Sequence, residues 1–215
     1  PDLDQLRRRV YRIEAALKDQ GALAREAMVV GPCGSATLGQ ALSLVRVLGQ
    51  EAHPLRERLP EYTDDAIKRM KEHLTTLPQE GDPDPALELL QFTRGLEEAR
   101  SLLGPRHPFL EAVLGVRNPA EVAAEALQGT RFRDPAFRRA LLKGGRRALE
   151  ASRDPLVALA RRLEPLLLEL RRRQDGIRAI LQENGARIAR ARYRVSGPSK
   201  YPDAPLTRGL PYGPV

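Results

Sequence analysis

Four Asp-Pro or Asn-Pro pairs stand directly before runs of periodic apolar residues. These pairs are Asp84-Pro85, Asn118-Pro119, Asp134-Pro135 and Asp154-Pro155. An Asp or Asn side chain at this position accepts hydrogen bonds from the unpaired N–H groups that begin a helix. Proline is tolerated at the first helical position because its missing N–H would have no partner there. The repeated pair therefore predicts four helix starts.

Glycines mark the matching helix ends. Gly104-Pro105, Gly115, Gly129 and Gly144-Gly145 follow the periodic runs, where glycine commonly terminates a helix. Further helices are predicted over 3–30, from Leu38 to about His53, and after a Thr63 cap. No strand pattern precedes residue 193, and aromatic content is only 4% with no tryptophan. We therefore predict an all-α chain of at least six helices with an aliphatic core.

The longest predicted helix begins at Pro155 and carries one apolar seam. The seam consists of Leu156, Leu159, Leu163, Leu166, Leu170, Ile177, Leu181 and Ile188. Such a continuous seam requires a packing partner along its length. Pro165 is expected to kink this helix or to restart it.

The formal net charge is +8, and much of it falls in the long helix, where Arg161–Arg194 holds ten arginines against four acidic residues. Two interpretations remain open. The arginines form a solvated polar face whose stems cover apolar surface, or they form an electrostatic face for an acidic partner. No run of basic residues is longer than three, and only four Phe and five Tyr are available to stack on bases, so nucleic acid is not expected as a partner.

No catalytic, cofactor-binding or metal-binding residue is predicted in this chain. His53, His73 and His107 lie in separate segments without metal-ligand spacing, and we expect surface or capping roles for them. Cys33 lacks a visible base, and Ser35 lacks the strand and second glycine of a nucleophile turn. No run of about 18 apolar residues predicts a membrane span, and no signal peptide is recognised.

Three segments resemble the bacterial dipeptidyl-peptidases of serine peptidase family forty-six. They are SLVRVLGQEAHPLRERLPEY, GTRFRDPAFRRALLKGGRRALEASRDPLVALARRLEP and ARIARARYRVSGPSKYPDAPLTRGLPYG. Their order and intervals are similar to those of the family, and the resemblance is best from Leu44 to Gly213. Several segments in register make this match specific.

The resemblance implies an exported exopeptidase, periplasmic or at the cell surface, that releases dipeptides from free peptide N-termini. Its chymotrypsin-like double β-barrel would carry the catalytic Ser, His and Asp, and an inserted helical domain would cap the cleft. On this interpretation residues 1–196 are the helical cap, and residues 197–215 are the linker into a second barrel that this chain does not contain. The chain would then be a fragment that hydrolyses nothing by itself.

The C-terminal segment departs from the family pattern. Pro205, Gly209 and Pro211 interrupt a run that is strand-like in the family, so we expect 197–215 to be extended or disordered here. Two rival interpretations remain. The chain could be a basic helical module that binds nucleic acid or an acidic protein, or a helical interaction protein that binds its partner through the seam from Leu156 to Ile188. Some self-association through exposed cap surface is expected as well.

Overall fold

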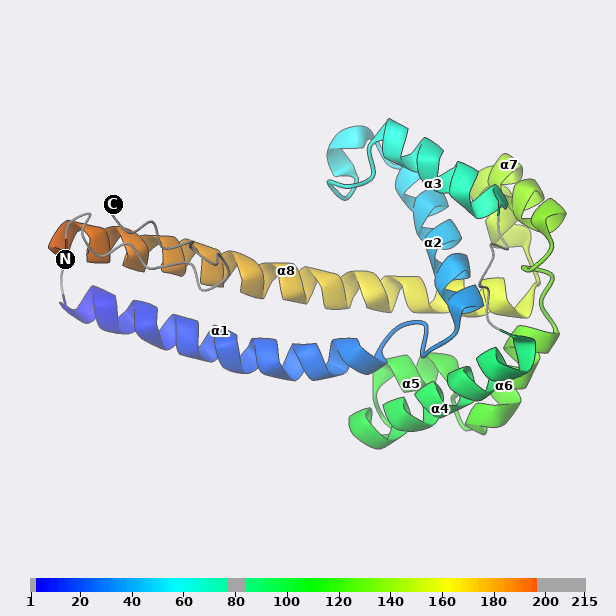
Figure 1. Cartoon of the computed structure of the whole chain (residues 1–215), viewed down its shortest axis with the longest axis horizontal. Helices are drawn as coiled ribbons and strands as arrows, with labels where there is room; N and C mark the ends of the chain where they lie inside the picture. The colour runs from blue at the N-terminus through cyan, green and yellow to red at the C-terminus, as the bar shows by residue number, and fades with distance from the viewer. Residues whose placement is uncertain (1–2, 77–83, 197–215) are drawn as a thin grey trace, which may run out of the picture. The chain divides into compact units, whose positions relative to one another are not determined.

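The computed structural model describes residues 3–76 and 84–196, and these residues form an all-α structure without a strand (Figure 1). The prediction of an all-α chain is therefore confirmed for the part that the structure describes. Its helices are α1 (Leu3–Val29), α2 (Ala36–Glu51), the 3₁₀ turn η1 (Leu55–Glu57), α3 (Asp64–Thr76), α4 (Pro85–Leu103), α5 (Pro108–Val113), α6 (Pro119–Gln128), α7 (Pro135–Ala151) and α8 (Pro155–Ser196).

The Asx-Pro pairs act as the sequence predicted. Asp84 accepts hydrogen bonds from the amides of Ala86 and Leu87 at the start of α4. The side chain of Asn118 accepts from the Ala120 amide at the start of α6, and that of Asp134 accepts from the Ala136 amide at the start of α7. Asp154 accepts from two amides at the start of α8. The helix starts are thus set by local hydrogen bonds that the sequence encodes directly.

Two expected breaks in helices have different outcomes. At Gly145 the backbone leaves the helical region, with φ 61° and ψ −152°, and α7 continues beyond this kink to Ala151. Glycine alone adopts such angles readily, so the break predicted at Gly144-Gly145 is present as a kink. At Pro165, by contrast, α8 runs through without a restart.

The chain divides into two compact units, of which the larger spans Gly21–Arg173. In this larger unit α2 packs against α3 and α7, α3 packs against α7, and α4 packs against α5 and α6. Its core is aliphatic with three phenylalanines, as the low aromatic content predicted. Fully buried core members include Leu38, Leu44, Leu48, Phe92, Leu96, Phe109, Phe132, Leu156, Leu159 and Leu163.

The smaller unit combines Pro1–Gln20 with Gln174–Val215, so its described part pairs the first half of α1 with the second half of α8. Among its residues with described side chains, Ala16 and Asn184 are buried. The seam residues Ile177, Leu181 and Ile188 are half-buried. In this unit the seam of α8 is grouped with α1, and its apolar side chains are only partly buried.

The structure describes α8 up to Ser196. The segment 197–215, including Pro205, Gly209 and Pro211, lies outside the described residues. None of the described helices combines the length and the low charge that crossing a membrane requires.

Candidate functional site: buried charges and the pocket at the kink of α7

A buried carboxylate ties the start of α2 to the first turn of α4. Glu88 accepts hydrogen bonds from the Ser35 hydroxyl at 2.7 Å and from the Thr37 amide and hydroxyl at 2.7 and 2.8 Å. Arg133 adds an ion pair at 2.5 Å. The Glu88 side chain is only 1% exposed, and burial without such partners would be costly. The four donors therefore hold Glu88 in its charged form.

These contacts also decide the direction of the Glu88 pKa. Burial raises the pKa of Glu88, but the hydrogen bonds from Thr37 and Ser35 and the charge of Arg133 outweigh it. The net result is a pKa below the ordinary value of 4.5. Ser35 at the same time caps α2 by accepting from the Leu38 amide at 3.0 Å. Its hydroxyl donates to a carboxylate that three other donors also contact, so the arrangement is structural and does not resemble an activated nucleophile.

Cys33 is an unreactive thiol. Burial raises the pKa of Cys33 to about 12, against a small opposing effect of a backbone hydrogen bond at Gly31. The thiol donates to the Val29 carbonyl oxygen at 3.3 Å. A nucleophilic cysteine requires a lowered pKa, so these observations support the sequence argument against Cys33 as a nucleophile.

The histidines take separate positions, as their spacing indicated. The Nδ1 atom of His107 accepts from the Phe109 amide and so caps α5, and Nε2 lies 3.4 Å from Glu26. His53 donates no described side-chain hydrogen bond, but its carbonyl oxygen accepts from Arg58. His73 lies in the last turn of α3. The capping role expected for His107 is confirmed. Within residues 3–76 and 84–196, no cluster of three metal-ligating side chains occurs.

Arg46 and Glu164 form a second buried tie, which joins α2 to α8 through two hydrogen bonds of 2.7 and 3.0 Å. Burial raises the pKa of Glu164, and its bidentate contact with Arg46 only partly opposes this. Burial lowers the pKa of Arg46, but the Glu164 carboxylate more than restores it. Burial is the largest single effect on both groups. It sets the direction for the carboxylate, whereas for the guanidinium the contacts with Glu164 and Tyr62 together outweigh it.

Arg138 is the largest fully buried side chain of the unit and is 1% exposed. Its guanidinium donates to the carbonyl oxygens of Leu74, Phe132 and Arg133 at 2.7 to 3.0 Å. It also lies 5.9 Å from the centre of the Phe132 ring. Arg138 thus fastens α7 to the end of α3 and to the loop before α7. Nothing in the sequence indicated this role, because a buried arginine and an exposed one are the same letter in a sequence.

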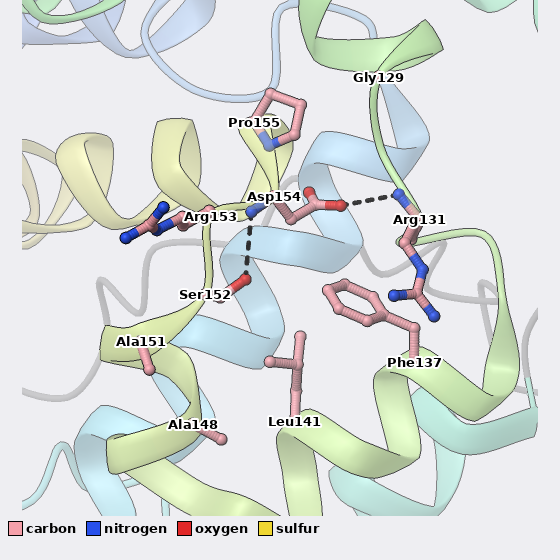
Figure 2. A pocket seen from close by; sticks show the side chains of 10 residues that line it. All are labelled: Gly129, Arg131, Phe137, Leu141, Ala148, Ala151, Ser152, Arg153, Asp154 and Pro155. Carbon is pink, nitrogen blue, oxygen red and sulfur yellow. Dashed lines mark hydrogen bonds between the residues drawn. The ribbon is translucent and has the colours of Figure 1, made fainter.

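A surface pocket of about 580 Å³ opens beside the kink of α7 (Figure 2). Phe137 and Leu141 line it from before Gly145, and Ala148 and Ala151 line it from after the kink. The remaining lining residues are Gly129, Arg131, Ser152, Arg153, Asp154 and Pro155. Because residues on both sides of the kink contribute, the break at Gly145 shapes this pocket.

Asp154 organises the wall of the pocket. Its carboxylate accepts from the Arg131 amide at 2.7 Å (Figure 2). It also accepts from the Thr130 hydroxyl at 2.8 Å and from the two amides of α8. The guanidinium of Arg131 lies 5.1 Å from the centre of the Phe137 ring. One residue that was predicted as a helix cap therefore also fixes the loop that carries Arg131.

The arginines of α8 are largely paired with acidic groups. Arg173 binds Glu26, and Arg171 binds Glu61, both across long sequence separations. Pairs within the helix are Arg172 with Glu169, Arg178 with Asp175 and Arg187 with Glu183. Glu26 and Glu61 are thus two acidic partners from outside α8 that offset part of its net positive charge, which favours the solvated-face interpretation over the electrostatic one.

Comparison with known proteins addresses the identity of the chain. A search of curated proteins found no match. The family model described as Peptidase S46 matches residues 2–215, which is almost the whole chain. This match agrees with the resemblance found in the three sequence segments. The chain therefore belongs to the peptidase S46 family, a family of serine peptidases.

Proposed function

We propose that residues 1–196 are the helical cap of a serine exopeptidase that releases dipeptides from peptide N-termini. Membership of the S46 family supports the peptidase relationship. The all-α architecture of the described residues carries the finer assignment, because the helices of such an enzyme belong to its cap and its barrels are made of strands. Residues 197–215 would lead into a barrel, and the enzyme would act in the periplasm or at the cell surface.

In this proposal the chain itself supplies no catalytic group. Acyl transfer by a serine peptidase needs a serine, a base and an orienting carboxylate within hydrogen-bond reach of one another. Ser35 is engaged with Glu88 and the α2 amides, and His107 caps α5. These two residues are thus occupied in structural roles, and the triad is expected elsewhere in the enzyme.

Exposed apolar side chains support a role for this unit beside another domain. Met28 is 84% exposed and Leu90 is 60% exposed, and both line a second pocket together with Cys33 and Gly95. An apolar surface of this kind is typical of a face that another part of a protein covers. The isolated chain is therefore expected to self-associate to some degree.

The first experiment assays the purified 215-residue chain with fluorogenic dipeptide substrates. We expect no release of dipeptides. Release that a serine-directed inhibitor abolishes would show that this chain carries its own catalytic centre, and the proposal would then be wrong.

The second experiment tests the cap role. Residues 1–196 replace the helical segment of an active S46 peptidase, and the chimera is compared with a version that lacks the segment. We expect the chimera, unlike the deletion, to cleave only peptides with a free N-terminus. A matched chimera with Arg138→Met, which should destabilise the cap, is expected to lose part of this selectivity. A folded chimera that cleaves N-terminally blocked peptides equally well would contradict the cap role.

A further inference from the structure

Several exposed basic residues lie close together on the segment that lines the pocket at the kink of α7. Residues 131–153 contain eight arginines and lysines against two acidic residues. Of these eight, Arg133 pairs with Glu88, Arg146 pairs with Glu150, and Arg138 is buried against carbonyl groups. The other five basic residues are exposed, and they are Arg131, Arg139, Lys143, Arg147 and Arg153.

Two of these exposed arginines lie at the pocket itself. Arg131 and Arg153 both belong to its lining and stand on opposite sides of Asp154 (Figure 2). The carboxylate of Asp154 already accepts from four donors in the surrounding loop and helix. Its negative charge is therefore engaged, and the mouth of the pocket attracts anions.

The interior of the pocket is apolar. Phe137, Leu141, Ala148, Ala151 and Pro155 contribute to its lining. Its volume of about 580 Å³ falls in the range of sites that hold small organic groups. An apolar pocket with basic residues at its mouth is complementary to an apolar side chain that is flanked by carboxylates.

We propose that this pocket binds an acidic peptide segment, with one apolar side chain in the pocket and neighbouring carboxylates at Arg131 and Arg153. The site would recruit an acidic protein partner or an acidic stretch of a longer polypeptide. This inference goes beyond the proposed cap function and does not depend on it, because it rests only on the charges and lining of the larger unit.

The pocket favours a peptide over a nucleic acid. A phosphate backbone could neutralise the arginines, but it has no aliphatic group to place against Leu141 and Ala148. A base could stack only on an open aromatic face, and the Arg131 guanidinium lies over the ring of Phe137. Single-stranded DNA therefore serves as the competing probe in the test.

The test measures fluorescence anisotropy with the full chain and labelled probes at low and at physiological salt. The main probe is a peptide with one leucine between pairs of glutamates. A second peptide has serine in place of the leucine, and a third has lysines in place of the glutamates. The fourth probe is an oligothymidine of similar length. We expect the leucine-containing acidic peptide to bind at least fivefold more tightly than any other probe.

Variants then locate the binding site. Arg131→Gln with Arg153→Gln should weaken binding of the main probe by roughly tenfold, as loss of two exposed charge contacts suggests. The matched control is Arg69→Gln with Arg106→Gln, which removes the same charge from exposed positions elsewhere in the unit. Ala151→Phe, a substitution at an exposed lining residue, should fill the pocket and reduce binding without a change in net charge.

Circular dichroism first confirms that each variant is folded. The proposal is upheld if the pocket variants lose affinity and the control does not. Equal losses for both double variants would mean non-specific attraction and would overturn it. Equal binding of the serine peptide, tighter binding of the oligothymidine, or no binding of the main probe at millimolar concentration would overturn it as well.

Discussion

The two units of this chain are both built from helices, yet they bury very different kinds of residues. The larger unit, Gly21–Arg173, encloses whole leucine and phenylalanine side chains together with the buried charges of Glu88 and Arg138. In the described part of the smaller unit, an alanine and an asparagine are buried, at positions 16 and 184. Apolar residues at helical spacing thus form a packed core where several helices converge. Where two helices meet, the same spacing buries few side chains.

α8 is therefore one helix whose two halves lie in different environments. Leu156, Leu159 and Leu163 are at most 2% exposed, whereas Ile177, Leu181 and Ile188 further along the same seam remain half-buried. Local stability depends on buried apolar contacts rather than on helix length. The two halves of α8 should therefore open independently.

Hydrogen exchange tests this comparison most directly. We expect backbone amides over 156–170 to exchange about two to four orders of magnitude more slowly than those over 177–190, because opening of the first half requires disruption of the core. Exchange measured by mass spectrometry on short peptides resolves the two segments. Equal protection along the whole of α8 would show that the two units open together.

Substitution of Arg138 should produce the largest loss of stability. Arg138→Met leaves three buried carbonyl oxygens without their donor, so we expect the free energy of unfolding to fall by about 3–5 kcal/mol. Urea denaturation followed by circular dichroism measures the change. The neighbouring exposed residue provides the control, since Arg139→Gln should shift stability by less than about 0.5 kcal/mol.

Substitution of Glu88 should cost about 2–3 kcal/mol at neutral pH, because Glu88→Gln removes the charge that accepts four hydrogen bonds. The pKa of Glu88 lies below its ordinary value, so its stabilising effect is present above about pH 4.5 and is lost as the pH falls through the folded-state value.

The stability gap between wild type and Glu88→Gln should therefore narrow as the pH is lowered below about 4.5. Urea titrations at several pH values measure this gap. Glu97→Gln, on the exposed face of the same helix, serves as the control and should leave stability nearly unchanged. A gap that stays constant down to pH 3 would mean that the charge of Glu88 contributes nothing to folding.

Glycine substitutions should have opposite signs in the two units. Gly145→Ala should destabilise the protein by about 1–3 kcal/mol, because alanine rarely adopts the φ of 61° found at the kink. Gly176→Ala lies within α8, where an added Cβ meets nothing within 4 Å, and should stabilise that helix by about 0.5–1 kcal/mol. Thermal unfolding compares the two variants. If Gly145→Ala stabilised the protein, the backbone at Gly145 could not have the positive φ of the kink.

The smallest effect is expected in the smaller unit. Arg187→Gln removes a pair with Glu183 in which both side chains are about half exposed, and such pairs contribute less than about 0.5 kcal/mol. The loss should vanish at high salt, because screening weakens exposed pairs. Helicity measured by circular dichroism at two salt concentrations checks this. A loss of stability as large as that of Arg138→Met would mean that the smaller unit depends on its ion pairs as strongly as the larger unit depends on its buried charges.

The predicted helix starts were confirmed because capping is local. Asp84, Asn118, Asp134 and Asp154 each satisfy amides two or three residues away, so the sequence contains the whole interaction. The aliphatic core and the seam of α8 followed from periodicity for the same reason. The break at Gly144-Gly145 was also visible, but the sequence indicated an end where the structure has a kink.

The pairing of charged side chains was the property that the sequence alone predicted least well. The sequence directed attention to the arginines of α8, of which Arg173 and Arg171 prove to be paired with acids 147 and 110 residues away. Five further exposed basic residues lie on 131–153, a segment whose charge did not stand out in the sequence.

The helical class, the positions of the caps and the family relationship could all be predicted from the sequence, because each of these depends on residues close together in the chain. The tertiary structure was needed to show which charges are buried, which are paired and where a pocket forms. Burial and pairing depend on residues that the fold brings together from distant positions, as Glu88 with Thr37 and Arg46 with Glu164 show. A charged side chain has the same formal charge whether it is buried or exposed, and its neighbours in the fold determine whether that charge stabilises the core or remains available to a partner.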